Sequence, residues 1–416
     1  MKKYDYINIP DEFYQKIEFE NIKSVEDIIA EVRKDGDVAL KKYSKLFDNC
    51  ERESFLITKE EIDKAFEFVD DKIIVALNYA IENIKEFASK QLASLKELRT
   101  EIGGNVLGHK IVPLNTVGCY IPGGNYPLPS TALMTIVPAK VAGVKKVVAC
   151  SPKIQPLTIA ACKLAGADEI YCVGGVQAVG AMAYGTCEIP KVDKIVGPGN
   201  KYVTAAKKYV YGECGIDFLA GPSEVLIVAD ESANPKYVAA DMLAQCEHDK
   251  DARAYLIAFS DEFIQKVEIS ASEFLKTLKT AEIAKVAFEK SIAVKVNSLD
   301  EAVSVSNLRA PEHLELCFKN CEEYTDRFTN YGSLFVGSHS AEVFGDYASG
   351  TNHTLPTNQV ARYSGGLSVF NYIKVQTYQV INPNTSDYLK KASSILAHSE
   401  GLEAHALAAE VRLDEI

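Results

Sequence analysis

The hydrophobic pattern of the chain changes near Thr116. Before that point, from Ser24 to about Arg99, apolar residues recur at the spacing of one face of an amphipathic helix. In "SVEDIIAEV" the residues that share this face are Val25, Ile28, Ile29 and Val32. Ser24 and Asp27 have the spacing of a capping box, which is typical of a helix start. The sequence therefore predicts a helical N-terminal lead-in.

After Thr116, short apolar runs alternate with segments of helical period. The first set of predicted strands covers residues 144–150, 169–173 and 193–200, the last running into a turn, and its helices cover residues 130–141, 156–164, 175–185 and 201–210. The alternation restarts with strands at 223–230, 254–259 and 292–296 and helices at 235–245, at about 261–290 and from Ser298 onward. Such alternation is typical of βαβ units in a parallel sheet. The sequence predicts an α/β protein with two tandem, Rossmann-like parallel-sheet domains.

Three local signals support the second set of elements and the end of the chain. Asn234 before Pro235 is typical of an N-cap followed by the first helical residue, and Ser298 with Glu301 has the spacing of a capping box. From about Tyr372 the chain ends in a small segment that contains "HSEGLEAHALAAEVRL", which predicts an amphipathic helix. This segment is too short to fold alone, so we expect it to dock on another surface.

Composition narrows the class of protein. The 416 residues are enough for two or three domains, and a net charge of −12 argues against nucleic acid as a partner, because such binding depends on clustered Lys and Arg. No run of about 18 uncharged apolar residues occurs, so no membrane span is expected. The ten cysteines form no CxxC pair and are predicted to be reduced thiols. We expect a soluble cytoplasmic protein.

Three turns that follow the predicted strands of the first sheet are rich in glycine: "GCYIPGGNYP", "VGGVQAVG" and "VGPGNKYV". None contains the dinucleotide fingerprint GxGxxG. Such glycines either let backbone N–H groups approach a phosphate or only make tight turns, and the pattern leaves both alternatives open. Tyr120, Gln177 and Asn200 stand beside these glycines as possible stacking and hydrogen-bonding groups.

The stretch "AQCEHDKDA" contains a candidate for half of a metal site. On a helix that continues from Pro235, Cys246 points into the core, whereas Gln245 and His248 lie three residues apart on the flank. Their oxygen and nitrogen would suit a borderline metal such as zinc. Glutamine is an uncommon zinc ligand, so a solvated surface histidine is the alternative.

Other candidate residues follow later in the chain. In "RAPEHLEL", Glu312 and His313 are neighbours and can serve one site only at an irregular turn, which Pro311 makes plausible; the alternative is a histidine satisfied at a helix start. The stretch "GSLFVGSHSAEVFGDYASGTNHTLPT" predicts a strand and then a long polar loop. Candidate ligands on that loop are His339, Asp346 and His353. On the predicted last helix, seven residues separate His398 from His405, which places both on one face, while Glu400 lies about 140° from His405.

Several long stretches of the chain, taken together, resemble histidinol dehydrogenases in order and spacing. They are "EVRKDGDVALKKYSKLFD", "GCYIPGGNYPLPSTALM", "GGVQAVGAMAYGT", "IVGPGNKYV", "AGPSEVLIVAD", "APEHLEL", "VFGDYASGTNHTLPT" and "SEGLEAHALAAEVR". The resemblance covers nearly the whole chain. It implies an NAD-dependent, zinc-containing oxidation of L-histidinol to L-histidine, the last step of histidine biosynthesis, which uses two NAD and one water.

The resemblance also implies roles for individual residues. The zinc ligands would be Gln245, His248, Asp346 and His405, and the acid/base pair Glu312 and His313. NAD would meet Tyr120, Gln177 and Asn200. The substrate contacts would be Ser223, Gln245, His248, His313, Asp346, Glu400 and His405, with His353 in support.

The chemistry fits these roles. Oxidising an alcohol to an acid takes two hydride transfers with an aldehyde between them, so the site needs a base for the hydroxyl and then a base to hydrate the aldehyde. By the resemblance, His313 and Glu312 fill these roles in turn. A histidine base must be neutral, and an unperturbed pKa near ~6.5 favours neutral to alkaline pH.

The resemblance further implies an intertwined homodimer with one Zn²⁺ per subunit, in which the C-terminal segment reaches the partner's active site. The predicted division is an N-terminal arm of residues 1–20 and a discontinuous α/β domain of residues 21–115 with 224–370 that carries the catalytic and metal residues. The NAD-associated α/β domain would be residues 116–223, and residues 371–416 would form the helical segment for dimerisation.

Two other functions are weighed against this one. A related NAD-dependent dehydrogenase could act on a different polar alcohol, and a regulator could bind zinc or a nucleotide without catalysis.

Two further residues have open roles. His398 stands two positions before Glu400 and could perturb substrate binding or face solvent, and Cys119 beside Tyr120 could be a nucleophile toward an aldehyde.

Overall fold

The computed structural model describes residues 1–16, 22–123, 127–384 and 387–413, so residues 17–20 of the predicted N-terminal arm lie outside the described residues. The chain forms two compact units. The first consists of Met1–Leu92 and Pro113–Tyr372, and the second of Ala93–Val112 and Ile373–Ile416. Within the described residues, no helix is both long and apolar enough to cross a membrane.

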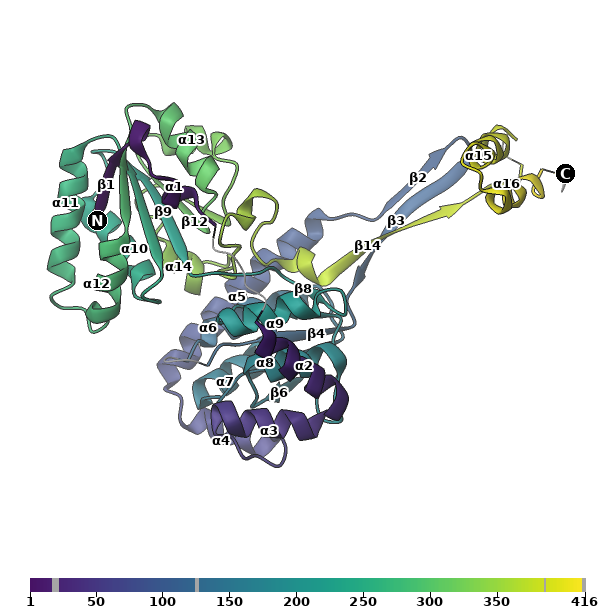
Figure 1. Cartoon of the computed structure of the whole chain (residues 1–416), viewed down its shortest axis with the longest axis horizontal. Helices are drawn as coiled ribbons and strands as arrows, with labels where there is room; N and C mark the ends of the chain where they lie inside the picture. Colours follow the sequence, from purple (N-terminus) through teal and green to yellow (C-terminus); the bar gives the residue numbers. More distant parts are fainter. Residues whose placement is uncertain (17–21, 124–126, 385–386, 414–416) are drawn as a thin grey trace. The chain divides into compact units, whose positions relative to one another are not determined.

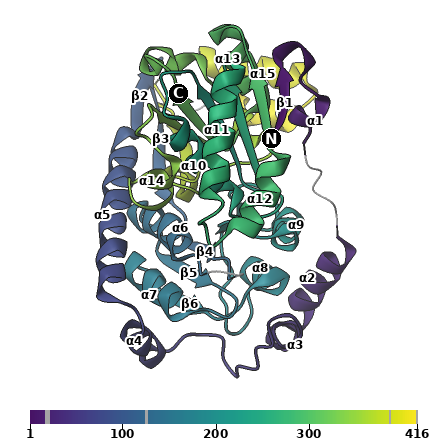
Figure 2. The same ribbon diagram turned by 90° about the vertical axis from the view of Figure 1, so that its left-hand side faces the viewer.

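The first unit contains a five-stranded parallel sheet in the order β6-β5-β4-β7-β8. Its strands are β4 (Thr116–Tyr120), β5 (Lys146–Cys150), β6 (Glu169–Tyr171), β7 (Lys194–Val196) and β8 (Gly215–Ile216). The crossover helices are α6 (Pro129–Val141), α7 (Pro156–Ala165), α8 (Gly175–Tyr184) and α9 (Lys201–Val210). Because the chain moves outward from β4 in one direction and then returns to the other side, α6 and α7 cover one face and α8 and α9 the other (Figure 2).

The helical lead-in packs against this sheet domain. It consists of α2 (Lys23–Asp35), α3 (Asp37–Asp48), α4 (Lys59–Glu67) and α5 (Asp71–Ser94). The predicted apolar face of α2 is buried, and Ile29 and Val32 share a core with Val179 and Met182 of α8. Burying aliphatic side chains of this size stabilises a fold by roughly 1.5–3 kcal/mol each. Residues 23–48 therefore share a core with residues 116–223, whereas the predicted division groups them with residues 224–370.

The first unit also contains a six-stranded parallel sheet in the order β1-β11-β10-β9-β12-β13. The strands are β1 (Lys2–Asp5), β9 (Glu224–Ala229), β10 (Arg253–Ala258), β11 (Ile292–Lys295), β12 (His313–Cys317) and β13 (Ser333–Val336). One face is covered by α10 (Pro235–Cys246), α11 (Asp261–Phe274) and α12 (Ala281–Lys290), and the other by α1 (Asp11–Tyr14) and α13 (Leu299–Arg309) (Figure 1). The prediction of two parallel-sheet domains is confirmed.

Most of the local signals hold, with two corrections. Asn234 caps α10 by accepting a hydrogen bond from the Lys236 N–H, and Ser298 caps α13 by accepting one from the Glu301 N–H. The predicted capping box at Ser24 is wrong, because α2 already begins at Lys23 and its N-cap, Ile22, makes no side-chain hydrogen bond. The N-terminal arm was predicted without a strand, but β1 adds to the sheet edge beside β11.

The second unit is a three-stranded sheet, in the order β14-β3-β2, followed by two helices. Its elements are β2 (Leu98–Ile102), β3 (Asn105–Pro113), β14 (Ile373–Val380), α15 (Tyr388–Ser399) and α16 (Glu403–Glu410). The predicted lead-in ran to Arg99, but helix ends at Ser94 and a hairpin follows, turning at Gly103 and Gly104, which both have positive φ. The predicted single last helix is wrong as well, because Gly401, with φ of 74°, separates α15 from α16.

The remaining described elements are short. They are α14 (Glu342–Tyr347), η1 (Tyr6–Asn8), η2 (Cys321–Arg327), η3 (Val360–Arg362) and η4 (Val369–Tyr372).

Candidate functional site

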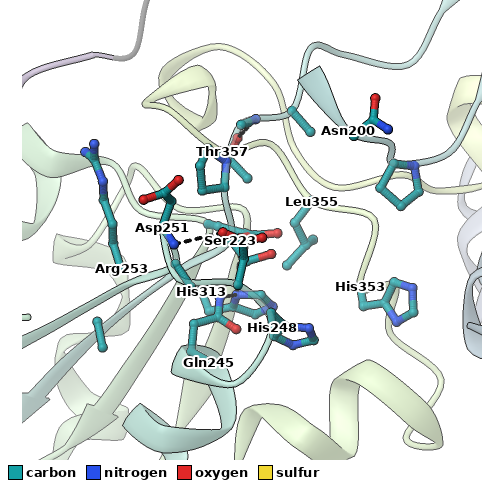
Figure 3. Close-up of a pocket in the computed structure, with 18 of the residues that line it drawn as sticks. Asn200, Ser223, Gln245, His248, Asp251, Arg253, His313, His353, Leu355 and Thr357 are labelled. Carbon is teal, nitrogen blue, oxygen red and sulfur yellow. Dashed lines mark hydrogen bonds and ion pairs between the residues drawn. The ribbon is translucent and has the colours of Figure 1, made fainter. Parts of the chain in front are cut away.

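A cavity of about 1030 Å³ lies in the first unit, between the two sheet domains. One wall consists of the turns that follow the strands of the five-stranded sheet, at its carboxyl edge, and includes Thr131 and Asn200. The other wall consists of residues that precede or begin the strands of the six-stranded sheet, at its amino edge; Ser223 precedes β9, and His313 begins β12 (Figure 3). Its volume lies at the upper end of the range for small-molecule and cofactor pockets.

The carboxyl-edge wall contains the turns after β4 and β7, where the strand order of the sheet reverses. Of the three residues predicted to meet a cofactor, only Asn200 lines the cavity; it caps α9 by accepting hydrogen bonds from the Tyr202 and Val203 N–H groups. Tyr120 is buried and accepts a hydrogen bond from the Gly175 N–H at 3.1 Å, and burial raises its pKa to about 12. Gln177 is buried and donates to Asp48 at 3.3 Å.

A buried ion pair between Lys207 and Asp217 supports the turn after β7 through hydrogen bonds to its backbone. The Gly197 N–H donates to Asp217 at 2.7 Å, and the Lys207 ammonium donates both to the Gly197 carbonyl at 3.0 Å and to Asp217. Gly197 has φ of 114°, and a Cβ there would collide with the Tyr120 carbonyl. Close packing of the backbone thus requires glycine at this position.

On the amino-edge wall, α10 ends at Cys246, which corrects the prediction of a helix that continues through His248. Gln245 is buried in the last turn, and the His248 N–H donates to the Gln245 carbonyl at 3.3 Å, so both side chains still line the same cavity. His248 keeps an exposed face, but crowding by protein atoms lowers its pKa and favours the neutral imidazole. The prediction that Cys246 points into the core is confirmed, and burial raises its pKa to about 12.

Glu312 and His313 lie at an irregular turn, as the sequence predicts. After α13 ends at Arg309, Ala310 adopts a left-handed conformation with φ of 48°, and both acid/base candidates then face the cavity. The Glu312 carboxylate accepts a hydrogen bond from the Glu224 N–H at 2.8 Å. His313 Nδ1 lies 3.1 Å from the Glu224 carbonyl oxygen and 3.7 Å from Glu312 Oε2. Both side chains are therefore oriented by the backbone of one residue.

The electrostatics of this pair are strongly perturbed. Burial raises the pKa of Glu312 to about 8, with the charge on His313 opposing the shift. Burial alone would lower the pKa of His313, but the carboxylates of Glu312, Glu342 and Asp346 around it raise that pKa well above the ordinary range. The surrounding carboxylates therefore favour the protonated form of His313.

Asp346 lies on the short helix α14 rather than on the predicted polar loop. Its Oδ1 is 3.4 Å from His313 Nε2, and the positive charge of His313 lowers the pKa of Asp346 against the effect of burial. His353 lies between the walls, with Nδ1 2.7 Å from the Asp346 carbonyl oxygen and Nε2 3.5 Å from Thr131 Oγ1. His339 does not line this cavity; its ring lies 6.0 Å from that of Tyr237.

The sequence analysis missed a group of buried carboxylates behind His313. Glu342 Oε2 lies 3.9 Å from His313 Nδ1, and the Glu342 N–H donates to Glu315 Oε1 at 3.1 Å. Burial raises the pKa of Glu342 to about 8 and that of Asp241, beside Glu315, to about 6. A glutamate inside the apolar strand "HLELC" was the signal that could have revealed this group.

Several buried polar atoms in the cavity wall lack hydrogen-bond partners. They are Gln245 Oε1, Asp346 Oδ1 and His313 Nε2, of which the last two form an ion pair with each other at 3.4 Å. Unpaired oxygens that line a cavity together with a neutral His248 form a donor set that fits a cation such as zinc. Among the described residues, no three His, Cys, Asp or Glu side chains stand close enough together to hold a metal by themselves.

The remaining candidates make none of the contacts described above. Glu400 caps the C-terminus of α15 and His405 lies on α16, both exposed and both in the second unit. Because the helix breaks at Gly401, His398 and His405 do not share one helix face; His398 instead contacts Glu410 at 2.9 Å and Glu403 at 3.1 Å. Cys119 is fully buried, which raises its pKa to about 12, so it is not an activated nucleophile.

Comparisons with known proteins agree on one family. The family model for histidinol dehydrogenase matches residues 14–413. The histidinol dehydrogenase of Methanocaldococcus jannaschii is 46% identical over 404 residues, which cover 96% of this chain and 94% of the relative. A histidinol dehydrogenase homolog of Shouchella clausii is 42% identical and covers 94% of both chains. The crystal structure of histidinol dehydrogenase from Elizabethkingia anophelis, 38% identical, matches with a TM-score of 0.94 over 99% of this chain and 98% of that one.

Proposed function

The chain belongs to the histidinol dehydrogenase family of oxidoreductases, and on that premise we propose that it oxidises L-histidinol to L-histidine through L-histidinaldehyde. Two NAD⁺ and one water are consumed, and two NADH and three protons leave with the histidine carboxylate. The observation that carries the proposal is the pair of buried bases, Glu312 and His313, held by one backbone in a cavity between two parallel sheets. The same cavity has room for a dinucleotide and a small polar alcohol.

His313 is proposed as the base that takes the hydroxyl proton. His313 Nδ1 lies 3.1 Å from the Glu224 carbonyl oxygen, an acceptor, and 3.4 Å from Gln245 Nε2, and the shorter contact favours the tautomer with hydrogen on Nδ1. In that neutral tautomer Nε2, which lies 3.4 Å from Asp346 Oδ1, is the basic nitrogen. Proton removal at Nε2 favours departure of the carbinol hydride in the first oxidation.

Glu312 is proposed as the base for the second oxidation. An aldehyde must add water before it can lose a second hydride, and a carboxylate beside the reacting carbon can remove a proton from that water. The Glu312 carboxylate is buried, and its Oε2 is fixed by the Glu224 N–H. Its raised pKa makes it a stronger base than an exposed glutamate once it is deprotonated.

Gln245, His248, Asp346 and His405 are proposed as the ligands of one Zn²⁺ per subunit. The unpaired oxygens of Gln245 and Asp346 and the neutral ring of His248 support this donor set. When bound, the metal would hold the amine and imidazole nitrogens of the substrate and fix the carbinol in place. A cation at Asp346 would also offset one of the carboxylates that raise the pKa of His313, which makes its neutral form accessible.

NAD⁺ is proposed to bind along the carboxyl-edge wall, where it would accept one hydride in each oxidation. The strand order reverses there and α9 begins there, two features that favour a pyrophosphate. Asn200 lines the cavity and is proposed to contact the cofactor directly. Gln177 and Tyr120 are proposed to complete the cofactor site from behind the residues that line the cavity. The hydrogen bond from the Gly175 N–H to Tyr120 supports this role, because it ties Tyr120 to the glycine-rich turn.

The substrate site is proposed to include Ser223 and, from the second unit, Glu400 and His405. We propose that residues 371–416 reach the active site of a partner in a homodimer. The exposed apolar side chains of α15 and α16, among them Ile395, Leu396 and Leu407, support a protein surface as their partner. His353 would support the site by linking Asp346 to Thr131. A cytoplasmic location is proposed with this biosynthetic role.

A second candidate is oxidation of another polar alcohol by the same machinery. The name of the Shouchella clausii relative, a histidinol dehydrogenase homolog, keeps this alternative in view. Substrate specificity depends on polar groups that reject analogues which leave them unpaired. A non-catalytic regulator would not need both Glu312 and His313.

One assay separates these functions. Purified protein is mixed with Zn²⁺, NAD⁺ and L-histidinol, and NADH is followed by its absorbance. Two NADH per histidinol supports the proposal, whereas one NADH would mean that the reaction stops at the aldehyde. No turnover of histidinol together with turnover of another alcohol would move the function to the second candidate. Chelation by EDTA should abolish the activity and added Zn²⁺ should restore it.

A further inference from the structure

Glu224 uses all its polar groups to hold the surroundings of the proposed bases. Its backbone N–H donates to Glu312 at 2.8 Å, and its carbonyl oxygen lies 3.1 Å from His313 Nδ1. Its side chain accepts a hydrogen bond from the Asn358 N–H at 3.0 Å and forms an ion pair with Arg309. One residue thus joins the start of β9, the turn that carries both bases and the segment that follows His353.

The ion pair is almost completely buried. The exposed fractions are 1% for both Arg309 and Glu224, and the guanidinium stacks 4.7 Å from the ring centroid of Tyr255. Nε and Nη1 of Arg309 have no hydrogen-bond partner. Removing two charges from water is costly, and a packed apolar pair of similar size is often as stable or more so. Stability is therefore a poor explanation for these two charges.

The position of Arg309 suggests a different explanation for the buried ion pair. Arg309 is the last residue of α13, and only Ala310 and Pro311 separate it from Glu312. The ion pair thus fixes one end of this short link to β9, while the hydrogen bonds of Glu312 and His313 fix its other end to the same residue. A shift of Glu224 would move both bases and would take the acceptor away from His313 Nδ1.

We infer that Glu224 and Arg309 are a positioning pair for the proposed bases, which sets the location of Glu312 and the orientation and tautomer of His313. Neither side chain is proposed to touch the substrate. The inference rests on the proposed function for its kinetic consequence, but its structural consequence, the tautomer of His313, is independent of turnover.

The kinetic test compares three variants under saturating Zn²⁺. Arg309→Met should lower kcat for histidinol oxidation by roughly 10- to 100-fold, the loss expected for a base displaced by about 1 Å, without a change in KM for NAD⁺. Arg309→Lys, which retains the charge, should restore part of kcat. The double variant Glu224→Gln/Arg309→Met removes both charges; it should regain the melting temperature of the wild type but not its kcat. A double variant with full activity would overturn the inference.

A spectroscopic test does not require turnover. With ¹⁵N-labelled histidine, the shifts of His313 report which ring nitrogen carries the hydrogen, and its signals are assigned by their absence in His313→Gln. The wild type should show hydrogen on Nδ1 in the neutral state, whereas Arg309→Met should show a mixture of tautomers. An unchanged tautomer together with an unchanged kcat in Arg309→Met would show that the pair is only structural.

Leu40→Ala is the control for loss of stability. Leu40 is fully buried in the core of the five-stranded-sheet domain and does not line the cavity. The Leu40→Ala variant should have a lower melting temperature, but its kcat should be unchanged at temperatures below its thermal unfolding. If the wild type does not oxidise histidinol, the proposed function fails while the tautomer test still decides the inference. If the wild type is active and Arg309→Met is equally active, the inference fails and the proposed function stands.

Discussion

The two walls of the cavity are opposite edges of two similar parallel sheets, and their chemistry differs accordingly. At the carboxyl edge of the five-stranded sheet, helices α6 and α9 begin, which brings the positive ends of helix dipoles to the cavity. At the amino edge of the six-stranded sheet, helices α10, α12 and α13 end, which brings the negative ends of helix dipoles there. Glu312 and Asp346 add carboxylates to the second wall, whereas the described lining residues of the first include none.

The proposed places of the ligands follow this difference. We propose the pyrophosphate of NAD⁺ at the carboxyl edge, and the metal cation with a cationic substrate at the amino edge. The rule that open parallel sheets bind ligands beyond the carboxyl ends of their strands therefore applies to only one of the two sheets. The site predicted from the sequence combined residues from both edges without distinguishing them.

The largest expected effect tests whether the chemistry depends on the amino-edge wall alone. His313→Gln removes the proposed first base. The rate at which the first NADH forms should therefore fall by roughly 10³-fold, within the range for loss of a general base. NAD⁺ affinity, measured by equilibrium dialysis, should stay unchanged because His313 belongs to the other wall. A matching loss of NAD⁺ affinity would contradict the separation of the walls.

Glu312→Gln should divide the two oxidations. The first NADH should appear at nearly the normal rate, whereas the second should be slowed by roughly 10²-fold because hydration of the aldehyde loses its base. Product analysis by mass spectrometry should then detect histidinaldehyde. Equal losses in both steps would show that Glu312 and His313 do not divide the labour in this way.

The pH dependence provides a related test with a smaller effect. Burial raises the pKa of Glu312 to about 8, and a base must be deprotonated to act. With histidinaldehyde as substrate, kcat/KM should therefore rise with pH and level off above about 8, since kcat/KM reports groups of the free enzyme. The kcat/KM profile of Glu312→Gln should lack this rise with pH. A rise near the ordinary glutamate pKa would mean that Glu312 is better solvated than its burial indicates.

The sequence predicted the buried elements better than the exposed ones. All six residues of β9 are buried, and Val225–Ala229 form an uninterrupted apolar run after Glu224 that is readable without tertiary information. β1 has only four residues, mostly exposed, and its membership of the sheet depends on β11, which lies far away in sequence. The break between α15 and α16 depends on the left-handed backbone of Gly401, which the helical periodicity concealed.

Local geometry left the site open, and the resemblance to a family selected its residues. The spacing of Gln245 and His248 and the proline before Glu312 were compatible with shared surfaces, and both pairs line the cavity. The strand order, which separates the two edges, is a tertiary property that no local pattern contains. The same is true of the carboxylate group around Glu342, whose members come from three separate elements.

Lys207→Met tests the carboxyl-edge wall. The variant removes a charged hydrogen bond to the Gly197 carbonyl, so the turn after β7 loses its support from beneath. A hydrogen bond of this kind contributes about 1.5–3 kcal/mol. If most of this free energy is lost from cofactor binding, KM for NAD⁺ should rise roughly tenfold. The KM for histidinol should change little. Lys207→Arg, which retains the charge, should show a smaller rise, and a rise in both KM values would mean that the two walls move together.

The smallest expected effect comes from a matched pair of helix caps. Asn200 caps α9 at the cavity, and Asn234 caps α10 at the carboxyl end of β9, away from the cavity. Replacing either by alanine should lower the free energy of unfolding by about 1 kcal/mol, measured by urea titration. Only Asn200→Ala should also raise KM for NAD⁺, by roughly two- to fivefold, because that wall loses both a cap and a polar contact. Equal effects of both substitutions on KM would mean that cofactor affinity follows overall stability rather than the polarity of the carboxyl edge.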